Sequence, residues 1–285
     1  MIFARPAGTI PARPAFSIQV DRSGAFAAAG VLAALNAQAG QILGALHYNI
    51  SIDSIMGLAG ISAVIWTAMF AALRIALDQP DGRVRGWDPA VLAAVIALSF
   101  LPMAVAAKLG LLLCGVYLFA SSPRESSSRR VALILLALTG PLIWGRLLLQ
   151  LFAAPILALD AHLVGLLTGM HVSGNTIRFA SRPGWMLIGD ACSSVHNISL
   201  ALVLWTTAAV VFRIRIDRRY VAAGALMMAW MFLLNIGRLT LLGLRPQDYD
   251  YLHNGTGAAL FGWAGLLGVA AIAGLGVLRA ADRQR

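Results

Sequence analysis

The sequence predicts an all-α protein that crosses a membrane several times. Of its 285 residues, 59% are hydrophobic and only 12% are charged, which is too little polar surface for a water-soluble domain of this length. The apolar residues form runs long enough to cross a bilayer, which takes about 17–25 residues of helix. The net charge is +10, but the arginines lie between these runs, which favours membrane loops over nucleic-acid binding.

Six apolar runs each predict one transmembrane helix. They cover residues 24–46, 54–77, 131–151, 194–212, 220–242 and 256–279. The stretch 89–120 is too long for one span, and Pro102 and Lys108 lie near its middle. Because proline ends or kinks a helix, we divide this stretch into spans at about 89–104 and 106–120. The total is about eight transmembrane helices.

Arginine-rich segments set the predicted orientation, because cytoplasmic loops of membrane proteins are enriched in Arg and Lys. There are four such segments: the N-terminal arm with Arg5, Arg13 and Arg22, the loops 121–130 and 213–219, and the tail 279–285. Eight helices place all four on the same side, whereas seven would put the N-terminal arm on the opposite side. We therefore predict that both termini are cytoplasmic.

This topology gathers three reactive side chains at the extracytoplasmic face. Cys192 precedes a span that ends at the basic loop 213–219, so it lies at the outer interface. Arg238 is near the outer end of the next span, and His253 comes just before the last one. Thiol, guanidinium and imidazole are therefore expected at the ends of three consecutive helices.

The segment before Cys192 is also predicted to be extracytoplasmic. Its first part is expected to form an interfacial helix after Pro155. Its second part has turn residues at Gly174–Asn175 and at Arg182–Pro183–Gly184, which predict a small irregular or β-hairpin segment. Such a segment would form a roof over the outer ends of the helices.

Cys192, Arg238 and His253 are suited to acyl transfer. A cysteine attacks as its thiolate, which a neighbouring cation stabilises. Arg238 is suited to that role, or to binding the oxyanion that forms after attack. His253 is suited to accept the thiol proton and to donate one to a leaving amine. An arginine inside an apolar span is costly unless it is paired or near water, so Arg238 is a functional candidate.

A second arrangement of the histidines is possible. His196 lies four residues after Cys192, so both can share one helix face. Cys192, His196 and His253 are then three potential metal ligands, and His162 and His171 are further candidates on the same side. A structural zinc site usually needs four ligands, and no other cysteine is available outside.

Two polar residues next to the candidates have a supporting role in this prediction. Asp190 either orients a histidine or, as we favour, caps the helix that follows. Asn235 lies one helical turn before Arg238 and can hydrogen-bond its guanidinium, or it makes a polar contact between helices. Cys114 lies inside an apolar run, so we expect it to be a buried side chain without a disulfide to Cys192.

Three ordered motifs carry a resemblance to a known family. "DACSS" at 190–194, "NIGR" at 235–238 and "LHNGTGAALFGW" at 252–263 resemble the exosortase/archaeosortase family of membrane transpeptidases. Cys192, Arg238 after Asn235, and His253 match the family's motif positions. The resemblance covers about residues 130–275, so we divide the chain into N-terminal transmembrane helices, 1–129, and an exosortase-like core, 130–285. Ser194 stands where the family usually has glycine.

The resemblance implies a membrane cysteine protease or transpeptidase. Such enzymes cleave a C-terminal sorting signal of the PEP-CTERM kind, consisting of a motif, a transmembrane helix and a basic tail. In this interpretation Cys192 forms a thioester at the outer face, Arg238 stabilises the thiolate or the oxyanion, and His253 protonates the leaving amine. The implied partners are membrane-anchored substrate proteins and the lipid bilayer, without a cofactor or nucleic acid, in a bacterial or archaeal cytoplasmic membrane.

Two other functions are compatible with parts of the sequence. A transport or assembly protein without catalytic activity is one, although a transporter usually has polar residues near the bilayer midplane, where these spans are nearly bare. A metalloenzyme that uses Cys192 and the histidines is the other, and it would be sensitive to chelators.

Overall fold

A computed structural model of the protein describes residues 21–47, 61–179, 181–253 and 255–281. Its helices are α1 (Arg22–Asn36), α2 (Ala39–His47), α4 (Ala63–Asp78), α5 (Asp88–Phe100), α6 (Ala104–Ser121), α7 (Ser127–Thr139), α8 (Gly145–Thr168), α9 (Ser194–Val211), α10 (Arg218–Leu244), α11 (Tyr249–His253) and α12 (Thr256–Ala281). Five helical stretches in the described residues are long and apolar enough to cross a membrane: Ala104–Ser121, Ser127–Thr168, Ser194–Val211, Arg218–Leu244 and Thr256–Leu278. The chain is thus a mostly helical, multi-pass membrane protein, and the total of eight spans stays a prediction.

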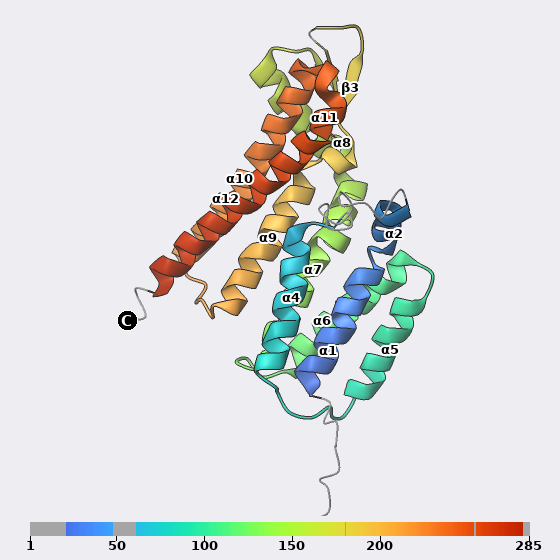
Figure 1. Ribbon diagram of the computed structural model, residues 1–285, viewed down its shortest axis with the longest axis vertical. Coiled ribbons are helices and arrows are strands. Elements are labelled where there is room, and N and C mark those ends of the chain that lie inside the picture. Colours follow the sequence, from blue (N-terminus) through green and yellow to red (C-terminus); the bar gives the residue numbers. More distant parts are fainter. Residues whose placement is uncertain (1–20, 48–60, 180, 254, 282–285) are drawn as a thin grey trace, which may run out of the picture.

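The helices form a lower bundle and an upper extension (Figure 1). Helices α1, α4, α5, α6 and α7 pack together below, and α9 lies between them and the long α10. Helices α8, α10 and α12 reach above the bundle. The start of α1, the α6–α7 and α9–α10 connections and the end of α12 all lie toward the lower end (Figure 1). The assignment of this end to the cytoplasmic face stays a prediction. Arg5, Arg13, Arg283 and Arg285 lie outside the described residues.

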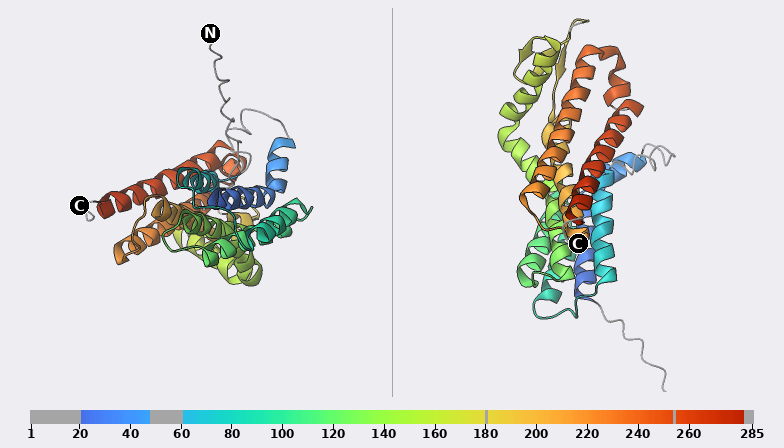
Figure 2. Two further views of the ribbon diagram at one scale, coloured as in Figure 1. Left: turned by 90° about the horizontal axis from the view of Figure 1, so that it is seen from below. Right: turned by 90° about the vertical axis from the view of Figure 1, so that its left-hand side faces the viewer.

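The first predicted span, 24–46, is not one helix. It divides between Asn36 and Ala39 into α1 and α2, and α2 turns away from the bundle (Figure 2). The Gln38 side chain bonds back to the carbonyl of Ala34 at 3.2 Å, and its own N–H bonds to Leu35 at 3.0 Å. These tighter bonds end the regular helix, because side-chain and i−3 bonds compete with the α-helical pattern. Much of the second predicted span, 54–77, is α4, and its part before residue 61 lies outside the described residues.

The stretch 89–120 is divided at its proline, as predicted. Helix α5 ends at Phe100 and α6 begins at Ala104. Pro102 lies in the connection between them, where it needs no N–H for a helical hydrogen bond. Lys108 lies inside α6, so proline rather than lysine marks the boundary.

A buried ion pair holds the lower ends of three helices together. Arg22 on α1 donates two hydrogen bonds to Asp88 on α5, from Nε to Oδ2 at 2.8 Å and from Nη2 to Oδ1 at 3.0 Å. The guanidinium also bonds to Ser122 at 2.7 Å after α6, and Tyr117 Oη donates to Asp88 Oδ1 at 3.0 Å. Both charged side chains are almost fully buried, so this end of the bundle depends on their mutual compensation.

The predicted span 131–151 continues further than expected. One π-helical turn, Gly140–Trp144, joins α7 to α8, and Pro141 inside it cannot donate a regular helical bond. The helix then breaks at Phe152, whose φ of −131° and ψ of 28° are not helical. Pro155 follows about one turn later and removes one backbone hydrogen bond of the helix, because proline has no N–H to donate. The interfacial helix expected after Pro155 is therefore the kinked continuation of the same element, ending at Thr168.

A small antiparallel sheet forms the predicted roof. Its strands β1 (Val172–Ser173), β2 (Thr176–Arg178) and β3 (Trp185–Leu187) lie in that order, at the upper end of the molecule beside α8 (Figure 1). The β1–β2 turn is Gly174–Asn175, and Gly174 has a φ of +58° that suits this turn. Asn175 also bonds to the N–H and carbonyl of Ile188, at 2.9 Å each. The sheet therefore fixes the chain just before the Cys192 segment.

Candidate active site

Cys192 is held between a short turn and the start of α9. It ends the 3₁₀ turn Asp190–Cys192, and α9 begins two residues later. The side chain of Ser193 caps α9 by accepting from the N–H of Val195 at 3.2 Å. The prediction that Asp190 caps this helix is wrong, because the 3₁₀ turn Asp190–Cys192 comes first and the N-cap is Ser193, three residues beyond Asp190.

The thiol of Cys192 lies against the imidazole of His253. Sγ is 3.4 Å from Nε2, a hydrogen-bond distance for sulfur. Cys192 is 9% exposed and belongs to an apolar cluster with Leu252, the neighbour of His253. The His253 ring stacks on Tyr249 one turn earlier on α11, with centroids 4.8 Å apart. A proton can therefore pass directly between thiol and imidazole.

Asn235 supports the backbone of Cys192. Its Nδ2 donates to the carbonyl of Cys192 at 2.7 Å and to Oγ of Ser194 at 3.1 Å. Its Oδ1 accepts from Nδ2 of Asn197 at 3.0 Å. The predicted hydrogen bond from Asn235 to Arg238 is not found among the described residues. Asn235 instead makes the predicted alternative, a polar contact between helices. Its partners are Cys192 and Ser194, at the start of α9.

Arg238 lies one turn further along α10, beside a small cavity. The cavity has a volume of about 90 Å³ and is also lined by Asn197, Asn235 and Phe261. Nε of Arg238 is buried and has no hydrogen-bond partner among the described residues. No hydrogen bond joins Arg238 to Cys192 or His253 among these residues. The Nε–H of Arg238 is thus a buried donor without a protein acceptor in the described part of the chain, and a buried donor of this kind favours an incoming acceptor.

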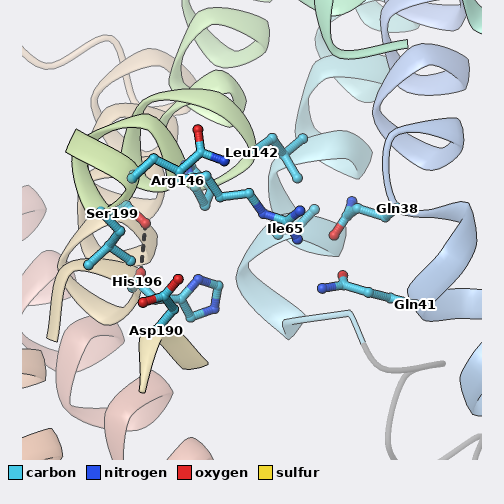
Figure 3. A pocket seen from close by; sticks show the side chains of 12 residues that line it. Gln38, Gln41, Ile65, Leu142, Arg146, Asp190, His196 and Ser199 are labelled. Atoms are coloured by element: carbon cyan, nitrogen blue, oxygen red, sulfur yellow. Dashed lines mark hydrogen bonds between the residues drawn. The ribbon is translucent and has the colours of Figure 1, made fainter. Parts of the chain in front are cut away.

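His196 and Asp190 line a larger cavity of about 430 Å³ with both polar and apolar walls (Figure 3). His196 on α9 points into it, as does Arg146 on α8, and Gln38 lies across from them (Figure 3). Arg146 is not among the predicted site residues. It is nevertheless an arginine inside an apolar span, which is the property that makes Arg238 a candidate. No bond joins His196 to Cys192 among the described residues. His253, rather than His196, is the imidazole that reaches the thiol.

His162 and His171 take part in local contacts. His162 Nδ1 lies 2.7 Å from the carbonyl of Ala158, one turn earlier on α8. His171 meets the edge of Trp185 in the sheet, with ring centroids 5.9 Å apart. Among the described residues, no group of three or more His, Cys, Asp or Glu side chains is placed to hold a metal ion.

A buried carboxylate that the sequence pattern did not single out lies against the Cys192–Ser194 segment. Asp160 on α8 is 1% exposed and accepts two hydrogen bonds from Ser194. An aspartate alone in the apolar run "ILALDAHLV" is as costly in a membrane helix as an arginine, which is the signal that could have identified it.

The family comparison covers most of the chain. A family model described as "Transmembrane exosortase" matches residues 48–270, which extends into the N-terminal helices beyond the region that the motifs indicate. No curated protein and no solved structure matches the chain. With more than half of its length matched, together with its multi-pass helical fold, the chain belongs to the transmembrane exosortase family.

Proposed function

We propose that this protein is a membrane cysteine transpeptidase that cleaves the C-terminal sorting signals of exported proteins at the extracytoplasmic face. The observation that carries the proposal is the 3.4 Å distance between Cys192 Sγ and His253 Nε2. A thiol beside an imidazole is the minimum arrangement for nucleophilic attack on a carbonyl. Membership of a family of transmembrane enzymes supports it.

The reaction begins with acylation of the thiol. His253 accepts the proton of Cys192, and the thiolate attacks the scissile carbonyl of the substrate. Arg238 stabilises the negative oxygen of the tetrahedral intermediate with its available donors. The C–N bond then breaks, the proton on His253 passes to the leaving amine, and the N-terminal part of the substrate stays on Cys192 as a thioester.

Transfer of the acyl group completes the cycle. An acceptor amine or water attacks the thioester, and His253 takes its proton. Collapse of the second tetrahedral intermediate breaks the C–S bond and returns the thiolate, which regains its proton from His253. The product carries a new amide bond when the acceptor is an amine, or a free carboxylate when it is water.

The substrate is a membrane-anchored protein. Its sorting signal consists of a short motif, a transmembrane helix and a basic tail. The helix anchors the signal in the bilayer and brings the motif to the level of Cys192. The basic tail is expected on the cytoplasmic side, according to the arginine bias of membrane proteins.

A cell-based assay tests the proposal. A tagged protein with such a tail is expressed with the wild-type enzyme, with Cys192→Ala or with Cys114→Ala, and its size is followed on a gel. Cys114 is the matched control, since it is a fully buried thiol whose Sγ contacts the carbonyl of Phe26. We expect the wild type and Cys114→Ala to shorten the substrate and Cys192→Ala to leave it intact. Equal processing by Cys192→Ala would rule out this mechanism.

A further inference from the structure

A polar cluster of four side chains lies directly behind Cys192, and it joins three helices. Asp160 comes from α8, Ser194 and Asn197 from α9, and Asn235 from α10. Ser194 lies at its centre. Its hydroxyl donates to Oδ1 of Asp160 at 2.9 Å and accepts from Nδ2 of Asn235 at 3.1 Å.

The burial of Asp160 requires an explanation. The side chain is 1% exposed, and the described residues place no Arg, Lys or His within ion-pair distance of it. Burying a carboxylate in apolar surroundings is costly unless hydrogen bonds compensate it. Both hydrogen bonds to Asp160 from the described residues come from Ser194, through its hydroxyl and, at 3.1 Å, through its backbone N–H. The position of Asp160 is therefore tied to one residue, two places after the nucleophile.

These contacts fix both peptide groups next to Ser193. The carbonyl of Cys192 accepts from Asn235 on one side. The N–H of Ser194 donates to Asp160 on the other. With both planes held by neighbouring helices, the Cα of Cys192 cannot rotate away from His253 without breaking a buried hydrogen bond. Errors of about 1 Å in the placement of reacting groups can cost on the order of 10²-fold in rate.

We propose that Asp160 is a positioning residue that, through Ser194, keeps the thiol of Cys192 within reach of His253. The proposal rests on the proposed thiol chemistry. It also gives Ser194 a role, since a glycine in its place has the N–H but lacks the hydroxyl that links Asp160 to Asn235. The hydrogen bonds of Asp160 among the described residues go to Ser194 and not to the thiol or the imidazole, so it acts through the backbone.

The test compares two variants with a matched buried carboxylate elsewhere. Asp160→Asn keeps the size of the side chain but replaces one acceptor by a donor facing Ser194. Ser194→Ala removes the hydroxyl and keeps the N–H. Asp88→Asn is the control, since Asp88 is equally buried at the other end of the bundle and bonded to Arg22. Each purified variant is measured for its thermal midpoint, for the rate of alkylation of Cys192 by iodoacetamide without substrate, and for kcat and KM.

We expect Asp160→Asn to lower the alkylation rate and kcat by about 10- to 100-fold with little change in KM, because the thiol loses its alignment. Ser194→Ala should show a smaller loss in the same two rates, and the double variant should lose less than the product of the two single losses. Asp88→Asn should lower only the thermal midpoint. Unchanged alkylation in Asp160→Asn, or equal loss in Asp88→Asn, overturns the proposal.

Two further outcomes separate the possible failures. If Asp160→Asn does not accumulate in membranes, Ser194→Ala decides alone, and an unchanged alkylation rate in it overturns the positioning role. The alkylation assay needs no sorting signal. A slower thiol in Asp160→Asn together with cleavage that does not depend on Cys192 would therefore support the positioning role and reject the proposed function.

Discussion

His253 Nε2 lies 3.4 Å from Cys192 Sγ although 61 positions separate the two residues in the chain. The contact is made by the last turn of the five-residue helix α11 and by the end of a 3₁₀ turn. Neither the 3₁₀ turn nor α11 is long enough to be stable alone. The contact between Cys192 and His253 therefore depends on the longer helices that adjoin these two elements.

We expect His253→Gln to lower substrate cleavage by about 10²-fold or more, the usual contribution of general acid–base catalysis. The glutamine keeps a polar side chain of similar size but cannot exchange the proton. The cleavage rate in membranes measures the loss. His162→Gln, His171→Gln and His196→Gln are the comparison set, and we expect them to stay active. An inactive His196→Gln beside an active His253→Gln would contradict the assignment.

Arg238→Gln should reduce cleavage by about 10²–10³-fold, comparable to the loss of one oxyanion donor. Arg238→Lys should recover part of the rate if charge is what matters, because lysine keeps the charge without the planar set of donors. The measurement is kcat/KM on a quantified substrate. Arg245→Gln is the control, since Arg245 is exposed and its ion pair with Asp248, at 3.8 Å, is long. Full activity of Arg238→Gln would exclude an oxyanion role.

Chelators should leave the enzyme active, and thiol reagents should not. We expect cleavage to be unaffected by prolonged treatment with EDTA or phenanthroline, and to be abolished by iodoacetamide. The same experiment with Cys114→Ser shows which thiol is responsible, and inhibition should be as complete as in the wild type. Loss of activity on chelation, with recovery on adding zinc, would support a metalloenzyme instead.

Asp88→Asn should destabilise the lower bundle, because it leaves the buried Arg22 without its counter-charge. The expected loss in the free energy of unfolding is about 3–5 kcal/mol, measured as the shift of the thermal midpoint in detergent. Asp78→Asn is the matched variant, as Asp78 forms an exposed pair with Arg74 at 2.9 Å. Pairs of that kind contribute about 0–1 kcal/mol, so its midpoint should hardly move. Equal shifts would show that burial of the Arg22 pair adds no stability.

Much of the helical arrangement can be predicted from the sequence, because the bilayer imposes simple rules. Runs of apolar residues give most of the helices, and Pro102 marks the boundary between α5 and α6. The failures have local causes. Gln38 takes part in a turn that ends α1, and the π turn at Gly140 lets one helix continue as far as Thr168. Neither the turn at Gln38 nor the π turn depends on hydrophobicity. The predicted helix boundaries at these two places follow hydrophobicity alone, so they miss both features.

The candidate site can be predicted in part for the same reason. Topology alone predicts one membrane face for Cys192, Arg238 and His253, and the structure brings two of the three into contact. The partners of Asn235 could not be predicted, since they depend on how α9 and α10 pack. Asp160 lies 34 positions before Ser194, and no local pattern links them.

The polar cluster behind Cys192 also has a consequence for biogenesis. The side chains around the thiol, Asp160, Ser194, Asn235 and His253, come from α8, α9, α10 and α11. They are therefore synthesised one after another and inserted into the membrane in turn. A nascent chain that has delivered only α9 to the bilayer carries Cys192 without the imidazole of His253 or the amide of Asn235. Under the proposed mechanism the thiol is therefore activated only when the late helices dock, and a half-inserted protein carries an unreactive cysteine.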